Sequence, residues 1–145
     1  MFRVVGFGLE DIKPLLNEPM NHVLRHWAKE DYAYVKHLER NSLALTGLVD
    51  DVPVICVFVV EIWNNRGYVV ALLSEKIREH SVSVYRGIKK FLSSIPYDRL
   101  EFDSPCGFTL GDRRAEFLGF DVMVKRARKY LPNGGDATLY EWVRA

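Results

Sequence analysis

Three consecutive apolar runs in the middle of the chain constrain the fold more than any other feature. Ser42 to Val49, Val52 to Trp63 and Arg66 to Leu73 are rich in valine, isoleucine, leucine and aromatic residues. Only Asp50-Asp51 and the stretch from Asn64 to Gly67 separate them, and such residues favour tight hairpin turns. We therefore predict three consecutive antiparallel strands. The middle run is apolar on both faces, so we expect it in the centre of the sheet.

The sequence on either side of these runs favours helices and further strands. Before them, we expect a strand over Phe2 to Phe7 and helices over 10–16, from Glu18 onward and over 32–38. After them, we expect a polar loop over 74–80, a helix over Ser81 to Ser94, a strand over Arg99 to Asp103, a helix over Leu110 to Leu118, and a hairpin of Asp121 to Tyr130 and Ala137 to Val143. This order predicts one α/β domain over residues 1–145, in the α+β sense of a mixed sheet flanked by helices. It has antiparallel N-terminal strands, a central β-α-β crossover and a C-terminal hairpin.

The segment after Glu18 carries an apolar stripe at helical spacing, made by Met20, Val23, Leu24 and Trp27. His22 and His26 lie beside this stripe, four residues apart, a spacing that can hold a metal ion. Because no third ligand is near them in the sequence, we expect surface or helix-packing histidines and no metal site.

Composition and charge narrow the function classes. The formal charge is +1 over 145 residues, which gives no global attraction to nucleic acid or to a membrane surface. The longest apolar run, Pro53 to Val60, is far shorter than the ~20 residues that span a bilayer, and no secretion signal precedes it. Cys56 and Cys106 are too few for a disulfide framework or a zinc cluster. The basic stretch from Lys125 to Lys129 fits a solvated edge strand. We expect a cytoplasmic protein with no nucleic-acid or membrane partner.

Two segments of the C-terminal third resemble a known family. Arg113 to Phe120 is similar to a helix that ends in leucine-glycine-phenylalanine, and Tyr130 to Tyr140 is similar to a terminal segment with tyrosine, proline, a turn glycine, aspartate and a leucine-tyrosine pair. On these segments and the element order, nearly the whole chain resembles the GNAT (acyl-CoA N-acyltransferase) superfamily. Together with the leucine-leucine-serine at Leu72 to Ser74, these segments resemble most closely the small acyltransferase-like proteins of tailed bacteriophages.

The resemblance implies that acetyl-CoA binds, as a substrate, in a V-shaped opening between the fourth and fifth strands, here Tyr68 to Leu73 and Arg99 to Asp103. Splayed strands leave backbone groups that the amides of a pantetheine arm can satisfy, and a helix N-terminus suits the pyrophosphate. The family motif there is glutamine or arginine, two residues, glycine, one residue, then glycine or alanine. In this sequence Arg78 to Ser83 stands at that place, with the arginine retained and serine at both small positions. The alternative to a phosphate site is a serine N-cap on a surface loop. The expected cofactor-binding residues are Ala71, Leu72, Leu73, Arg78, Ser81, Val82 and Ser83.

Acyl transfer to an amine needs a neutral amine, a stabilised oxyanion and a proton for the departing thiolate. In many relatives a tyrosine four residues before the motif glycine supplies that proton, and here the position is Ala115. Three other residues are candidates: Glu61 as a base, Tyr68 as a proton donor and Asp103 to orient the amine. Each has a structural alternative, namely an exposed or ion-paired glutamate, a core or rim tyrosine, and a strand-ending turn.

Two functions are consistent with these residues. The first is an N-acetyltransferase that moves an acetyl group from acetyl-CoA to an amine, with a host protein among the candidate acceptors. The second is a catalytically weakened GNAT-fold phage protein that binds and modulates host or virion proteins, in the host cytoplasm. The C-terminal hairpin could also pair with a second copy as a homodimer. Because Ala115 removes the usual proton donor, the sequence leaves open whether the chain is an enzyme.

Overall fold

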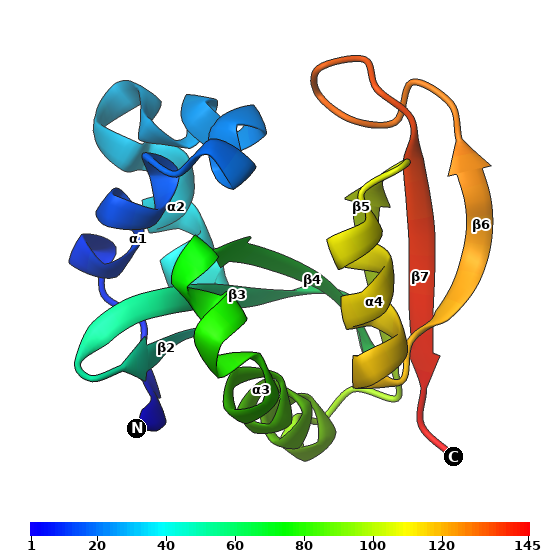
Figure 1. Cartoon of the computed structure of the whole chain (residues 1–145). Helices are drawn as coiled ribbons and strands as arrows, with labels where there is room; N and C mark the ends of the chain where they lie inside the picture. The colour runs from blue at the N-terminus through cyan, green and yellow to red at the C-terminus, as the bar shows by residue number, and fades with distance from the viewer.

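A seven-stranded mixed sheet runs through the computed structural model (Figure 1). The structure describes the backbone of residues 1–145 and all side chains except those at positions 19, 20, 22, 23 and 110. The strands lie in the order β1-β2-β3-β4-β5-β7-β6, and only the β4–β5 pair is parallel. Their bounds are β1 (Phe2–Gly6), β2 (Ser42–Val49), β3 (Val52–Trp63), β4 (Arg66–Leu73), β5 (Arg99–Pro105), β6 (Asp121–Ala127) and β7 (Ala137–Val143). The predicted α/β fold with a mixed sheet is confirmed.

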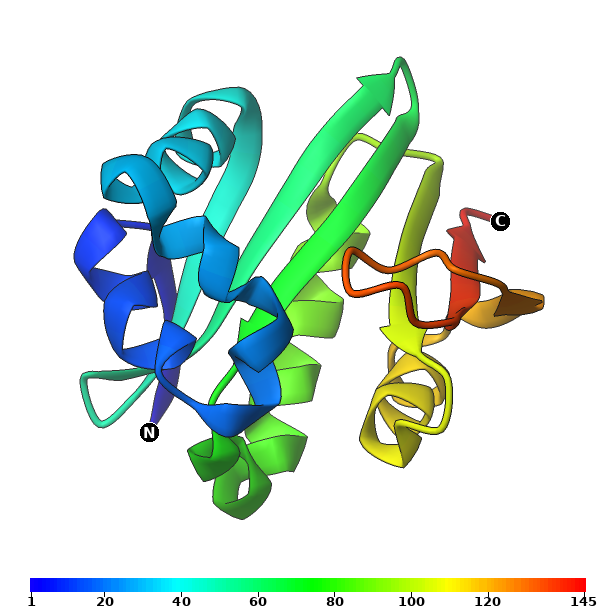
Figure 2. The same cartoon turned by 90° about the horizontal axis from the view of Figure 1, so that it is seen from above.

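Helical segments cover both faces of this sheet (Figures 1 and 2). One face carries α1 (Leu9–Leu16), the 3₁₀ segment η1 (Pro19–Ala28) and α2 (Lys29–Asn41). The other carries the 3₁₀ segment η2 (Glu75–His80), α3 (Ser81–Ser94) and α4 (Thr109–Leu118). Within the described residues, none of these helices has the length and apolar character needed to cross a bilayer.

Strand β3 separates two apolar cores. Its alternation sends Cys56 and Phe58 to the α1 face and Val57 and Val59 to the α3 face, and all four are at most 1% exposed. This confirms the prediction that the middle apolar run is buried on both faces. Burial also raises the pKa of the Cys56 thiol to about 12, so this thiol is unreactive and serves to fill the core.

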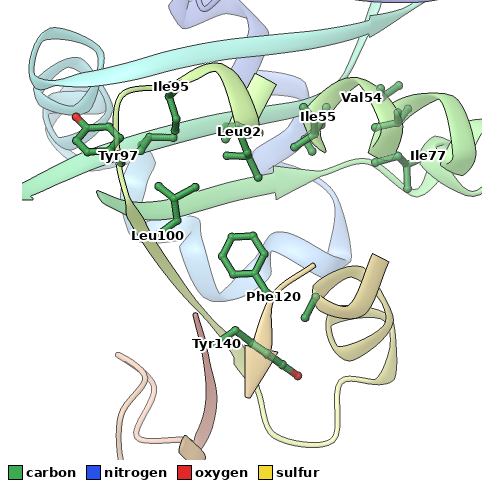
Figure 3. Packing of buried hydrophobic residues seen from close by; sticks show 14 of the residues in the cluster. Val54, Ile55, Ile77, Leu92, Ile95, Tyr97, Leu100, Phe120 and Tyr140 are labelled. Atoms are coloured by element: carbon green, nitrogen blue, oxygen red, sulfur yellow. The ribbon is translucent and has the colours of Figure 1, made fainter. Parts of the chain in front are cut away.

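The core on the α3 face joins the two halves of the sheet (Figure 3). Leu100 of β5 is fully buried there, with Leu92 and Ile95 from the α3 side and Phe120 and Tyr140 from the β6–β7 side. This packing holds β5 and β7 against α3 even though β4 and β5 pair over a short length only.

The boundaries of β2, β3, β4, α3 and β7 are those predicted. Those of β1, α1, α2 and α4 differ from the prediction by one to three residues at an end, and four other segments differ for reasons that the contacts show. The segment over 19–28 is a 3₁₀ helix anchored by Asn21, whose side-chain amide donates to the Leu15 and Leu73 carbonyls. The expected loop over 74–80 contains η2, which the Ser74 hydroxyl caps. Strand β5 continues two residues beyond the prediction, and β6 ends at Ala127, where the Asp136 carboxylate accepts the Lys129 N–H and draws the chain out of the ladder.

Two predictions for the segment after Glu18 depend on side chains outside the described residues. They are the contribution of Met20 and Val23 to the apolar stripe and the pairing of His22 with His26. Gly119 ends α4 in the left-handed conformation, at φ 83°, which glycine adopts without a steric penalty.

Gly47 of β2 has no room for a side chain. A Cβ there would lie 2.6 Å from Ile55 Cγ2 and 2.7 Å from the Phe2 ring. We therefore expect Gly47→Ala to lower the free energy of unfolding by about 1–3 kcal/mol through overpacking, measured by urea titration. Gly6→Ala is the matched control, because a Cβ there meets nothing within 4 Å. Equal stability of the two variants would contradict the packing argument.

Candidate functional site

Strands β4 and β5 are neighbours over only three residues each. Residues 66–68 pair with 99–101, and the strands then separate (Figure 2). The facing edges of 69–73 and 102–105 have no strand partner across the gap, so their backbone groups are available to a ligand. The predicted V-shaped opening is therefore present. However, Tyr68 and residues 99–101 belong to its closed end and not to its arms, because they still pair.

A buried ion-pair cluster holds the closed end of the V. Glu101 of β5 is 7% exposed and accepts hydrogen bonds from Arg66 Nε at 2.6 Å, Arg66 Nη2 at 2.9 Å and Arg99 Nε at 2.7 Å. Arg99 also donates to Glu141 of β7 at 2.9 Å. The Arg66 hydrogen bond is the main reason that the pKa of Glu101 lies below its usual value. Because Arg66 and Glu101 lie on different strands, this pair joins β4 to β5 at the point where they begin to diverge.

A cleft of about 800 Å³ passes through the sheet where the strands diverge. This volume is within the range of small-molecule sites. It is lined by residues 68–71 and Leu73 of β4, together with Phe102 to Pro105 of β5. On one face its walls come from α3 and α4, and on the other from η1, α2 and the loop after β6 that crosses the opening in Figure 2. Of the predicted site residues, this cleft brings together Tyr68, Ala71, Leu73 and Asp103.

Two polar groups of the cleft wall are buried without a hydrogen-bond partner in the described part of the protein, Ser104 Oγ and Arg114 Nε. The Arg114 guanidinium lies between the Tyr85 and Phe108 rings, 5.8 Å from each ring centre. Burial lowers the pKa of Arg114, although a guanidinium remains charged at neutral pH. A buried cation with no acidic partner is suited to an anionic ligand. Sequence reasoning missed Arg114 and Tyr85, since nothing in their spacing distinguishes them from surface residues.

The beginning of α3 lies close to this arginine. His80 precedes the helix, and no side chain caps its first N–H groups. The serine N-cap interpretation is thus wrong, because Ser81 and Ser83 are already inside the first turn. Arg78 is exposed on η2, and its charge contributes to the lowered pKa of Arg114. Free helical N–H groups and two cations form one anion-attracting region on the α3 face.

The opposite face of the cleft holds a carboxylate and phenol groups. Asp103 projects from β5 on this face, and burial raises its pKa to about 6. Tyr130, from the loop after β6, lies near it: burial is the main cause of the raised pKa of Tyr130, and the Asp103 charge adds to it. Tyr68 lines the same face at the closed end of the V. A carboxylate with a pKa of about 6 can accept a proton at neutral pH, and a phenol can donate one.

Seven predicted or motif residues lie outside the cleft. Three of them, Arg78, Ser81 and Ser83, are in η2 and the first turn of α3. Glu61 is exposed at the far end of β3. Burial is the main cause of the raised pKa of Tyr97, and the Glu61 carboxylate adds to it. Leu72 is fully buried in the α1-side core, so that only its backbone faces the opening. Val82 is 58% exposed, and Ala115 is fully buried in the α3-side core. The position of the usual proton donor therefore places no functional group in the cleft.

Comparisons with known proteins identify the fold. No family model matches the sequence, and no curated protein matches it significantly. Solved structures match over nearly the whole chain. Ard1 from Thermoplasma volcanium has a TM-score of 0.77 at 11% identity, over 99% of this chain and 98% of that one. The microcin C7 self-immunity acetyltransferase MccE, in complex with acetyl-CoA and AMP, has a TM-score of 0.72 at 14% identity, over 98% and 92%.

RimL, a ribosomal L7/L12 alpha-N-protein acetyltransferase in complex with coenzyme A, has a TM-score of 0.69 at 13% identity, over 99% of this chain and 94% of that one. The chain therefore has the GNAT acetyltransferase fold, as predicted. At these identities the likeness establishes the fold alone. The resemblance to tailed-phage proteins stays a prediction.

The ion-pair cluster at the closed end of the V should be a major contributor to stability. We expect Glu101→Gln to lower the free energy of unfolding at pH 7 by about 1–3 kcal/mol, because it leaves Arg66 and Arg99 without their buried partner. The pKa of Glu101 is lowered in the folded state, so its contribution is present above the unfolded pKa and is lost as pH falls through the folded value. The difference between the variant and the parent should therefore shrink in acid. Glu141→Gln, which affects Arg99 alone, is the control. An effect of Glu101→Gln that is unchanged in acid would exclude an electrostatic origin.

Proposed function

We propose that this chain is an N-acetyltransferase that binds acetyl-CoA between β4 and β5 and transfers the acetyl group to an amine on the opposite face of the sheet. The observation that carries the proposal is the divergence of two parallel strands after three paired residues, with the cleft that it opens. Two further observations support it: the unpaired Arg114 Nε and Ser104 Oγ in the cleft wall, and structural neighbours such as MccE and RimL that bind acetyl-CoA or CoA.

The residues of the cleft fit an acyl-CoA. Its pantetheine amides would pair with the free backbone edge of β4, where Ala71 and Leu73 line the cleft and Leu72 offers its backbone alone. Its phosphates would be held by the first N–H groups of α3, at Ser81, Val82 and Ser83, by Arg78 and by Arg114. When bound, acetyl-CoA supplies an activated acyl group. No metal is needed for this chemistry.

The proton transfers are assigned to two residues on the η1 face. An acceptor that arrives as an ammonium ion first loses one proton to solvent and becomes a neutral amine. As the nitrogen–carbon bond forms, this amine loses one further proton to the Asp103 carboxylate. As the carbon–sulfur bond breaks, the Tyr68 hydroxyl gives one proton to the departing sulfur, so the products are an amide and CoA. Tyr68 recovers its proton and Asp103 loses one through solvent. Tyr68 thus takes the role for which Ala115 has no group.

The first prediction concerns acetyl-CoA itself. At a hundredfold excess over its dissociation constant, acetyl-CoA should add about 2.7 kcal/mol to the free energy of unfolding, measured as a thermal shift. Arg114→Ala and Arg78→Ala should each reduce the shift, because each removes a cation from the phosphate region. Arg113→Ala is the matched control, since Arg113 is exposed on the same helix and does not line the cleft. No shift for the parent protein at millimolar acetyl-CoA would refute the proposal.

The second prediction concerns the base. With a pKa of about 6 for Asp103, kcat/KM should fall about tenfold per pH unit below that value, because the protonated carboxyl cannot accept a proton. Asp103→Asn should lower kcat by about 10²–10⁴-fold. It should also raise the free energy of unfolding at neutral pH, since a raised carboxyl pKa means that ionised Asp103 destabilises the folded state. Glu61→Gln is the second arm of the test. If that variant alone were inactive, Glu61 would be the base, as the strand pattern first indicated.

A catalytically weakened protein that docks on host or virion proteins is the second candidate. The buried Ala115 favours it, as do the apolar side chains exposed along the edge strand β6, Val122, Met123 and Val124. The same edge is where a second copy would pair. This candidate predicts that mutation of β6 changes partner binding, whereas acetyl-CoA leaves thermal stability unchanged.

A further inference from the structure

The half of the cleft on the η1 face is aromatic and carries little charge. Four aromatic side chains converge on it from four different elements: Trp27 from η1, Tyr34 from α2, Tyr68 from β4 and Tyr130 from the loop after β6. Trp27 is 3% exposed and meets Tyr34 edge to face, with ring centres 5.1 Å apart. Tyr34 and Tyr130 are 45% and 47% exposed, so their rings form the rim. Such a surface suits a flat apolar group.

The charges on this half allow only one cationic group in a ligand. Among the described residues that line the whole cleft, Asp103 is the only carboxylate and Arg114 the only arginine or lysine, and Arg114 lies on the α4 face. His26 of η1 also lines this half. A ligand with a second ammonium group would bury that charge without a partner. A ligand with a carboxylate beside its amine would bring that carboxylate against Asp103, and Arg66, whose charge reaches Tyr130, is already paired with Glu101.

The two amide side chains on this half, Asn21 and Asn133, already bond to the protein's own backbone. The Asn21 amide already donates to the Leu15 and Leu73 carbonyls and accepts the Leu73 N–H. The Asn133 side chain accepts the Gly135 N–H. A peptide laid across this half would need a partner for each of its amide groups, and an amide left without one is costly to bury. A small amine with an aromatic body has no such requirement.

We propose that the acceptor is a small arylalkyl monoamine, whose ring lies among Trp27, Tyr34 and Tyr130 while its nitrogen points to Asp103. This inference rests on the proposed acetyl transfer and specifies its second substrate. The rings of Tyr34 and Tyr130 contact the ring of the ligand, and the Asp103 carboxylate binds its one amine. The class therefore excludes polyamines, free amino acids and peptide N-termini as preferred acceptors.

The test is a calorimetric titration with 2-phenylethylamine, n-butylamine and spermidine, with and without saturating CoA. It is followed by initial rates with acetyl-CoA. We expect 2-phenylethylamine to bind about tenfold more tightly than n-butylamine, because only the former buries a ring. Tyr34→Ala should reduce this preference about threefold to tenfold. Glu39→Ala, an exposed position on the same helix that does not line the cleft, should leave it unchanged.

Three results would overturn the inference: equal binding of n-butylamine, tighter binding of spermidine, or faster acetylation of a peptide with an N-terminal phenylalanine than of 2-phenylethylamine. The amine titration without CoA also separates this inference from the proposed function. Stabilisation by acetyl-CoA without selective amine binding would refute the acceptor class alone. Selective amine binding without any stabilisation by acetyl-CoA would support the aromatic site and refute the transferase.

Discussion

The pairing of Glu101 with Arg66 and Arg99 is the interaction on which the cleft depends. It joins β4 to β5 at the last residues that pair, and Leu100 packs beneath it in the α3-side core. Fixed at that end, the two strands can diverge beyond it without coming apart. Two parallel strands paired along their whole length would leave no opening. A weaker attachment would let the β5–β7 half move away from α3.

The two faces of the opening differ in charge, and this difference suits a reaction between two unlike molecules. The α3 face gathers Arg114, Arg78 and uncapped helical N–H groups, all of which attract an anion. The η1 face gathers the Asp103 carboxylate and tyrosine rings, which suit an apolar amine. In the proposed reaction the sheet separates the two ligands, which meet only where the strands part.

Asp103 illustrates how the environment of a residue decides its chemistry. It is followed by Ser104 and Pro105, which in the sequence indicate a turn that ends a strand. In the fold, β5 continues through both residues, and the loop after β6 crosses the opening beside Asp103. Burial then holds the pKa near 6, within the range of a working base. Glu61, by contrast, interrupts an apolar strand and so stood out in the sequence, yet it lies in solvent.

The sequence by itself determined the elements whose pattern is local. The alternation and the turn residues around Asp50 and Asn64 specify β2, β3 and β4, and the apolar face from Val84 to Ile95 specifies α3. The 3₁₀ segment η1 and the end of β6 were not predictable, because Asn21 bonds to Leu73, 52 residues away, and Asp136 bonds to Lys129 across the loop of the hairpin. Tertiary structure alone decided the site. Arg114 and Tyr85 are 29 residues apart in the chain, and Asp103 and Trp27 are further apart still. Their burial, and hence their charge and pKa, arises only when the sheet brings their elements together, since desolvation depends on every neighbour in space and not on neighbours in sequence.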